Sequence, residues 1–133
     1  MIFEEYSTIL NDVIELAKER RMYDEKYGLK SGSLVELMEF EETEEGKKLK
    51  QYDKDLDEYL QGLDFEAIKI IQTIMYLGRD NDYPNLCPEQ RYKRIREEFD
   101  KSGWKSKSIE ISQIAEKLPL DKYLKAGIDI LNQ

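Results

Sequence analysis

The sequence predicts an all-α protein, a single-domain helical bundle of about five to six helices over residues 1–133, with a central buried helix near residues 65–77. The first observation is that apolar residues recur at three- and four-residue steps in several segments, which is the spacing of amphipathic helices. The second is that helix-capping and helix-breaking residues stand between these segments. The third is that residues 65–77 are apolar on nearly every side, as expected of a helix inside a bundle.

Composition indicates a folded chain with an excess of negative charge. The 133 residues are enough for one domain with a real core, and 40% of them are hydrophobic. The net charge of -8 disfavours phosphate backbones and anionic membranes, so we expect neither membrane contact nor non-specific nucleic-acid binding. The chain starts with early acids, lacks a long apolar segment and has one cysteine, Cys87, so we expect a cytoplasmic protein.

Two helices are predicted in the first part of the chain. The first runs to about Arg21, because its apolar residues follow the helical spacing. These residues are Ile2, Phe3, Tyr6, Ile9, Leu10, Val13, Ile14 and Ala17. Gly28 marks the loop that follows, and Ser33 stands three residues before Glu36 as in a capping box. A short apolar helix containing Leu34, Leu37 and Met38 is expected after Ser33.

A second long helix is predicted from Thr43, and it carries a narrow apolar seam. The seam residues alternate steps of three and four, as in a coiled coil. They are Leu49, Tyr52, Leu56, Tyr59 and Leu63. We interpret them as a candidate helix–helix interface, within the chain or with a second copy. Gly62 is expected to end this helix and Asp64 to cap the next one.

The second half of the chain is predicted to hold the central helix and three more. The central helix runs from Phe65 to Leu77 and is expected to end at Gly78. Pro88 is placed at the start of the next helix, where proline is tolerated. Gly103 is expected to end that helix in a left-handed cap, with Trp104 in contact with Phe99, Ser108 to open another helix, and Pro119 to begin the last.

No catalytic or metal-binding constellation can be assigned. The chain contains no histidine, which removes the commonest general base and the commonest zinc ligand. The alternating carboxylates of residues 53–57 resemble the start of a calcium loop, but Glu58 stands where that loop needs glycine. The other acids are expected to face solvent, which disfavours a pair of metals held by inward carboxylates. We therefore predict no catalytic residue, no metal ligand and no cofactor.

Arg79 is the most unusual local feature. A guanidinium follows the predicted helix end at Gly78, where an apolar contact is usual. We expect Arg79 to bind the carbonyl groups that end the helix or to pair with a carboxylate. The functional alternative makes Arg79, together with Tyr76 and Tyr83, a contact for an anion or a partner.

Charge is distributed unevenly along the chain. Residues 36–66 contain twelve acids and four bases, whereas residues 88–107 contain seven bases and four acids. The bases of the second segment, among them Arg91 and Arg94, are candidates to contact an acidic partner, a phosphate group or the acidic helix of a second subunit. An ordinary solvated face is the alternative. Cys87 is interpreted as a packed or incidental cysteine, because no histidine is available to activate it.

Two short segments resemble a bacterial family known as domain of unknown function 3775. The first is Met75-Tyr76-Leu77-Gly78-Arg79, which follows an apolar helix and precedes an acidic turn, although Tyr76 stands where the family more often has tryptophan. The second begins with Leu118-Pro119-Leu120-Asp121-Lys122-Tyr123-Leu124 and continues through Gly127 to Leu131, similar to the closing pattern of the family. Together they span residues 63–131. The resemblance implies a helical bacterial protein with no assigned reaction.

The leading functional hypothesis is a non-enzymatic helical module for protein–protein interaction or regulation, which binds a protein partner or associates with itself as a homodimer. It rests on the seam, on nine tyrosines and on the absence of histidine. An alternative is a metal- or ligand-dependent enzyme that uses carboxylates, with Arg79 orienting an anionic group. A weaker alternative is anion or nucleic-acid contact through residues 91–107. Binding of a small molecule is left open.

Overall fold

The computed structural model describes residues 4–133, and these residues form seven α-helices and no strand. A short 3-10 helix, Glu4–Tyr6, precedes the first of them. The α-helices are α1 (Ser7–Tyr27), α2 (Leu34–Glu41), α3 (Glu44–Gln61), α4 (Phe65–Asp80), α5 (Pro88–Ser102), α6 (Lys107–Ala115) and α7 (Leu120–Leu131). The all-helical class is confirmed, whereas the expected number of five to six helices is too low. The predicted positions Ile2 and Phe3 lie outside the described residues.

Side-chain caps explain where several helices begin. Ser33, Thr43 and Asp64 each accept a hydrogen bond from the backbone N–H three residues later, at 3.2, 3.0 and 2.8 Å. These three predicted starts are confirmed. The predicted start at Ser108 is wrong, because Ser106 caps α6 by accepting from the N–H of Ile109. A serine at either position can supply the cap, so the sequence alone did not distinguish them.

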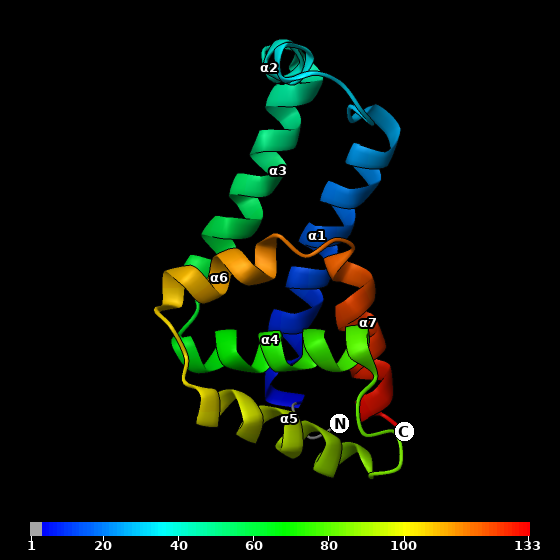
Figure 1. The fold of residues 1–133 in the computed structure, drawn as a ribbon, viewed down its shortest axis with the longest axis vertical. Helices are drawn as coiled ribbons and strands as arrows, with labels where there is room; N and C mark the ends of the chain where they lie inside the picture. Colours follow the sequence, from blue (N-terminus) through cyan, green and yellow to red (C-terminus); the bar gives the residue numbers. More distant parts are fainter. Residues whose placement is uncertain (1–3) are drawn as a thin grey trace.

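Figure 1 shows how the helices are arranged. α1 and α3 run side by side and project beyond the other helices, and α2 lies across their far end. α4 lies across the opposite part of the molecule, where it packs against α5, α6 and α7. α7 also contacts α1, and α6 contacts α3. Among residues 4–133, no helix combines the length and the apolarity needed to cross a membrane.

The core is centred on α4, as the sequence predicted. Nine of its residues are buried: Ala67, Ile68, Ile70, Ile71, Gln72, Thr73, Ile74, Met75 and Leu77. Six of them, Ile68, Ile70, Ile71, Ile74, Met75 and Leu77, belong to one hydrophobic cluster with buried side chains from α1, α3, α5, α6 and α7. A helix surrounded by other helices on several sides has to be apolar all round, which explains its composition.

The crossing of α4 and α7 depends on two glycines. A Cβ at Gly78 would lie 1.9 Å from the carbonyl oxygen of Tyr123, and a Cβ at Gly127 would lie 2.2 Å from that of Ile74. Both obstacles are backbone atoms of the facing helix, so a side-chain rotation cannot make room. The glycines are therefore required for close approach of the two helices.

The prediction that α4 ends at Gly78 is wrong. The helix continues to Asp80, and Asn81 ends it in the left-handed conformation, with φ of 53°. Asparagine is one of the few non-glycine residues that adopt this conformation readily. Gly78 is explained by helix packing rather than by a helix end.

The C-terminal end of α5 agrees with the sequence prediction in its capping residue and its aromatic contact, although Gly103 does not have the predicted left-handed helical conformation. Gly103 has a positive φ of 90°, and its N–H donates to the carbonyl of Phe99 at 3.0 Å. The rings of Phe99 and Trp104 lie 5.5 Å apart between centroids, so the predicted contact is confirmed. Trp104 also donates from its indole nitrogen to Asp100 at 2.6 Å.

Residues 21–55, which we call the projecting hairpin, are built differently from the rest of the chain. They include the end of α1, all of α2 and most of α3, and Gly46 is the only buried residue among them. A Cβ at Gly46 would lie 2.1 Å from the carbonyl oxygen of Phe40, so Gly46 allows α2 and α3 to meet closely. The hairpin is therefore stabilised by contacts between partly exposed side chains and by the close approach of α2 and α3 at Gly46.

Candidate functional site

The predicted contact residues Tyr76 and Arg79 are adjacent in the structure. The Arg79 guanidinium lies over the Tyr76 ring, 4.6 Å from its centroid. Arg79 also donates to both carboxylate oxygens of Asp80, from Nε at 2.7 Å and from Nη2 at 3.1 Å. The hydrogen bond to Asp80 raises the pKa of Arg79. Pairing with a carboxylate is one of the two structural roles that the sequence suggested, and it engages the guanidinium within the chain.

The other three predicted contact residues surround the connection between α4 and α5. The Arg94 guanidinium lies 5.1 Å from the centroid of the Tyr83 ring, and the Tyr83 hydroxyl donates a hydrogen bond to Glu98, which raises the pKa of Tyr83. Arg91 is 4% exposed and donates to the Asp82 carbonyl and the Asn81 side chain. Arg91 thus holds this loop in place and is not available to a partner.

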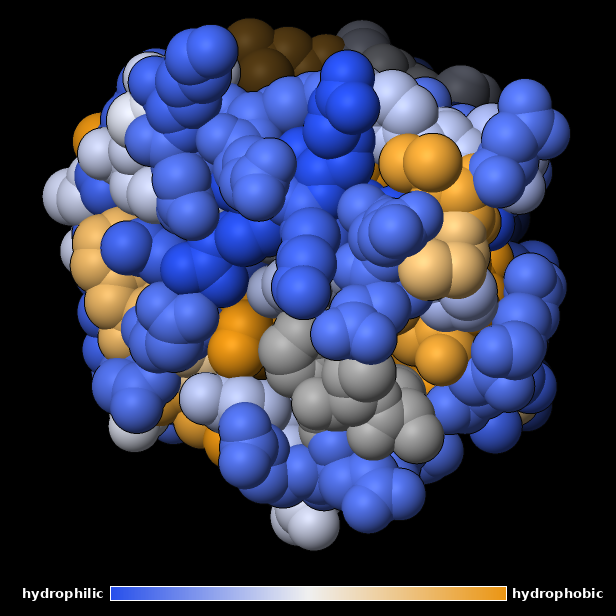
Figure 2. All heavy atoms as spheres, turned by 90° about the horizontal axis from the view of Figure 1, so that it is seen from below, coloured by the Kyte–Doolittle hydropathy of each residue, from blue (hydrophilic) through white to orange (hydrophobic). Residues whose placement is uncertain are grey.

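Most bases of residues 88–107 are engaged within the chain. Arg96 pairs with Glu66 and Asp100 at 3.0 and 3.1 Å, and Lys93 and Arg94 pair with acids one turn away. Lys107 donates to the Gln61 carbonyl at 2.8 Å. Figure 2 shows that the end of the molecule opposite α2 is covered mainly by hydrophilic side chains. This distribution resembles a solvated face more than a concentrated anion site.

The predicted seam of α3 faces α1. Leu56 is fully buried in the core, and the Tyr59 hydroxyl donates to Asp12 of α1 at 2.7 Å. The Tyr52 ring lies 5.4 Å from the Tyr23 ring of α1, and Leu49 lines a cleft described below. Leu63, which the seam also included, lies beyond the end of α3. Because α1 covers the seam, little of the seam is accessible to a second copy of the chain.

The carboxylates of residues 53–57 lie within α3, one long regular helix, rather than in a loop. In the part of the chain that the structure describes, no three acid or cysteine side chains come together in a way that can hold a metal ion. Cys87 is exposed at the start of α5, and its side chain makes no cap hydrogen bond.

A patch of exposed apolar side chains lies on α2. Leu34, Val35, Leu37 and Met38 are between 45% and 74% exposed, and α2 has no buried residue. Leu34, Leu37 and Met38 share one side of the helix by their three- and four-residue spacing, with Val35 beside them. We call these four side chains the α2 apolar face. Clustering of large exposed apolar side chains in this way is typical of interaction sites.

Negative charge surrounds the α2 apolar face. Residues 33–46 contain six glutamates and no basic residue. The six are Glu36, Glu39, Glu41, Glu42, Glu44 and Glu45. Only Glu41 among them forms an ion pair in the described structure, with Lys50 at 3.3 Å. The tip of the projecting hairpin is thus both apolar and strongly acidic.

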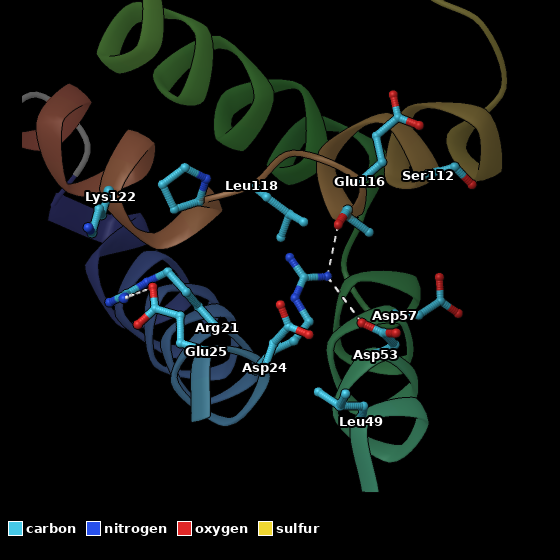
Figure 3. A pocket seen from close by; sticks show the side chains of 13 residues that line it. Arg21, Asp24, Glu25, Leu49, Asp53, Asp57, Ser112, Glu116, Leu118 and Lys122 are labelled. Carbon is cyan, nitrogen blue, oxygen red and sulfur yellow. Dashed lines mark hydrogen bonds and ion pairs between the residues drawn. The ribbon is translucent and has the colours of Figure 1, made fainter. Parts of the chain in front are cut away.

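A cleft of about 850 Å³ lies where the projecting hairpin leaves the packed helices (Figure 3). Its walls come from α1, α3, the end of α6, the connection from α6 to α7 and the first turn of α7. Charged side chains predominate, and Leu49, Leu118 and Pro119 supply apolar surface. The volume lies within the range of about 300–1,000 Å³ that is usual for small-molecule sites. Arg79 does not line this cleft.

Arg20 is the most unusual residue of the cleft. It is 7% exposed, and its Nη1 donates to the carbonyl of Ala115, the last residue of α6, at 2.8 Å. Nη1 also lies 3.5 Å from an Asp53 oxygen, which is long for an ion pair with good hydrogen-bond geometry. Nε and Nη2 are buried, and neither has a hydrogen-bond partner among residues 4–133. Leaving two donors of a cation unpaired in this way costs free energy.

The neighbouring Arg21 shows what such donors bind in this protein. Its Nε and Nη2 donate to the Asp121 carboxylate at 3.0 Å each, and Asp121 is 6% exposed. The hydrogen bond to Asp121 raises the pKa of Arg21, and Glu25 adds to the effect. Arg21 is therefore satisfied within the chain, whereas Arg20 is not.

Sequence reasoning missed both the α2 apolar face and Arg20, although each left a signal. Leu34, Leu37 and Met38 were expected in a helix, and the many glutamates around these apolar residues were the signal that the helix lies at the surface. Arg20 continues the buried stripe of Leu10, Val13 and Ala17, a position where an apolar residue is usual. An arginine in a core stripe indicates a buried partner or a ligand.

Comparisons with protein-family models, with curated proteins and with solved structures give no match to this chain. The resemblance of residues 63–131 to domain of unknown function 3775 stays a prediction, and the residues themselves carry the functional argument.

Proposed function

We propose that this protein is a helical protein–protein interaction module and that its partner binds the α2 apolar face. The observation that carries the proposal is an eight-residue helix with no buried residue and four large exposed apolar side chains. Burial of such side chains by a partner contributes about 1.5–3 kcal/mol for each one that becomes fully covered. The hydrophobic core contains no residue of α2, so we expect the scaffold to fold without a contribution from this face.

The charge around the face defines the chemistry of the partner. Six glutamates without a base between residues 33 and 46 attract a segment that combines apolar and basic side chains. The same charges repel a second copy of this tip, so self-association through α2 is disfavoured. A basic amphipathic helix offers both properties on one face, and we propose this class of partner.

The proposal is tested with a pair of synthetic helical peptides. One peptide carries leucine and lysine, and the other carries leucine at the same positions and glutamate in place of lysine. Fluorescence anisotropy should show saturable binding of the basic peptide alone, with an affinity that falls as salt is added. Replacing Leu34 and Met38 together by serine should weaken this binding about tenfold or more, because two apolar contacts are lost.

Ile109 provides a matched control. It is also an exposed apolar residue, 45% accessible, but it lies on α6 and not on the projecting hairpin. Ile109→Ser should leave peptide binding unchanged. The proposal fails if the acidic peptide binds equally well, or if the variants at Leu34 and Met38 bind the basic peptide as tightly as the unaltered protein.

A further inference from the structure

We propose that the cleft between α1, α3 and the connection from α6 to α7 binds a small zwitterion of the amino-acid class, with its carboxylate on Arg20. This site is separate from the α2 apolar face and does not depend on the function proposed for that face. The inference starts from the two buried nitrogens of Arg20, Nε and Nη2, that lack a hydrogen-bond partner. A buried cation with two free donors raises the free energy of the empty cleft, and a ligand that accepts hydrogen bonds from both donors removes this cost.

The geometry of the free donors selects a carboxylate. The Nε–H and Nη2–H groups of a guanidinium are parallel neighbours and match the two oxygens of a carboxylate. Arg21 uses this pair of nitrogens to hold Asp121. Nη1 of Arg20 is engaged by the Ala115 carbonyl, which fixes the guanidinium plane while its other edge stays free.

The remaining charges of the cleft select a ligand that also carries a positive group. The lining contains three bases, Arg20, Arg21 and Lys122, and five acids, Asp24, Glu25, Asp53, Asp57 and Glu116. This net negative lining repels a phosphate or a simple carboxylate, whereas a zwitterion has no net charge and its positive group is attracted by the acids. Asp24 lies one turn after Arg20 on the same side of α1, and no described residue pairs with its carboxylate. We assign the ammonium group to Asp24 and Asp53.

The apolar lining accommodates a hydrophobic side chain. Leu49, Leu118 and Pro119 line the cleft, and Figure 3 shows Leu118 extending into it from the connection between α6 and α7. Less than 1 Å² of each free Arg20 nitrogen is exposed, so a ligand reaches them when a covering side chain moves. Leu118 is 62% exposed, and side chains with that freedom change rotamer within nanoseconds. We assign the opening movement to Leu118.

Isothermal titration calorimetry with three probes tests the assignment. The probes are L-leucine, 3-methylbutylamine, which lacks the carboxylate, and 4-methylpentanoate, which lacks the amino group. We expect saturable binding of L-leucine and binding at least about tenfold weaker for each analogue, because each loses one charged contact. Absence of saturable binding of L-leucine, or equal binding of the amine, overturns the proposal.

Three variants locate the site. Arg20→Lys keeps the positive charge but removes the parallel donors, so it should weaken L-leucine binding about tenfold or more. Asp24→Asn should weaken binding of L-leucine but not of 4-methylpentanoate, and it should leave the stability of the free protein unchanged. Arg94→Lys, the same exchange on α5, should have no effect on binding.

The two cleft variants also test whether Arg20 is paired with Asp24 within the chain, which would leave no donor for a ligand. If Asp24 itself satisfies Arg20 in solution, Asp24→Asn destabilises the free protein and L-leucine does not bind, which overturns the proposal. If Arg20→Lys does not fold, the contrast between L-leucine and 4-methylpentanoate in Asp24→Asn decides. Unchanged L-leucine affinity in a folded Arg20→Lys variant also contradicts the assignment.

Discussion

The projecting hairpin and the packed helices below it use apolar residues in opposite ways. In the packed part, α4 alone has nine buried residues, and two glycines bring it against α7 at backbone contact. In the hairpin, residues 21–55 bury only Gly46, and α2 exposes four large apolar side chains. The same kinds of side chain therefore stabilise one region and are left free in the other.

This difference confines the residues that stabilise the fold to one part of a short chain. A module that keeps its core at one end can vary its tip without losing its fold, because tip residues make few buried contacts. The cleft lies between the two regions, next to Arg20, the last buried residue of α1, and Arg21. Substitutions in the packed helices, at this junction and at the tip should therefore have decreasing effects on the free energy of unfolding.

The largest effects are expected in the packed helices, and the crossing of α4 and α7 provides the first test. Gly78→Ala and Gly127→Ala place a Cβ 1.9 and 2.2 Å, respectively, from a facing carbonyl oxygen. Alanine favours a helix by about 1 kcal/mol over glycine, but overpacking against a backbone costs about 3 kcal/mol or more, so we expect net destabilisation of at least about 2 kcal/mol. Urea denaturation should show a lower midpoint for both variants.

Gly62 is the control for this prediction. It follows α3 with φ of -76°, and a Cβ at this position would lie 3.5 Å from its nearest neighbour, an ordinary contact. Gly62→Ala should be neutral or stabilise the protein by up to about 1 kcal/mol. A similar loss of stability at Gly62 and Gly78 would show that the helix crossing is not the cause.

A smaller effect is expected where α1 meets α7. Asp121→Asn removes the buried charge that Arg21 binds, and we expect a loss of about 2 kcal/mol in the free energy of unfolding. Glu25 binds the same arginine at 3.0 Å, but its side chain is 57% exposed. Glu25→Gln should therefore change stability by less than about 0.5 kcal/mol. Equal effects in urea denaturation would contradict the role that we give to the buried partner.

Alkaline pH should loosen the contact between α1 and α3. Burial, followed by the hydrogen bond to Asp12, raises the pKa of Tyr59 from 10.0 to about 12. A raised pKa in the folded state stabilises the protein fully below pH 10.0, and this contribution is lost as pH rises to about 12. The free energy of unfolding should fall more steeply over this range in the unaltered protein than in Tyr59→Phe.

Asp12→Asn sharpens this test. It removes the charge that the Tyr59 hydroxyl binds, so the pKa of Tyr59 should move back toward 10.0 while burial still raises it. The pH range in which stability falls should then become narrower. Identical slopes in the unaltered protein, Tyr59→Phe and Asp12→Asn would show that this hydrogen bond does not couple the two helices in solution.

Helices that bury one face were predictable from the sequence, because burial leaves a periodic pattern. The caps at Ser33, Thr43 and Asp64 were predictable for a similar reason, since each side chain acts within its own turn. Gly78 was misread because its role depends on α7, which is distant in sequence. A glycine at a helix end and a glycine at a helix crossing look alike until the partner helix is known.

The candidate sites were less predictable than the fold, because they depend on which side chains lack a partner. Arg79, Tyr83 and Arg94 looked available in the sequence, yet Asp80 and Glu98 engage them in the structure. Arg20 stands out in the sequence only by continuing an apolar stripe, and the structure adds that two of its donors lack a partner among the described residues. Asp80 and Glu98 lie close to Arg79 and Arg94 in the sequence, but spacing alone does not show that these pairs form. Whether a cation keeps a free donor depends on packing in three dimensions.

The smallest effect on stability is expected at the tip, although the effect on binding there should be large. Leu34→Ser and Met38→Ser, made together, should change the free energy of unfolding by less than about 0.5 kcal/mol, because both side chains are largely exposed. Leu56→Ala on α3, where the side chain is fully buried, should cost about 2–5 kcal/mol in the same urea denaturation. If the tip variant is instead strongly destabilised, the α2 apolar face is packed within the chain in solution and has no surface to offer a partner. If the double variant is stable but no longer binds the basic peptide, folding does not require the side chains of Leu34 and Met38. Binding of a partner is then the physical reason for their exposure.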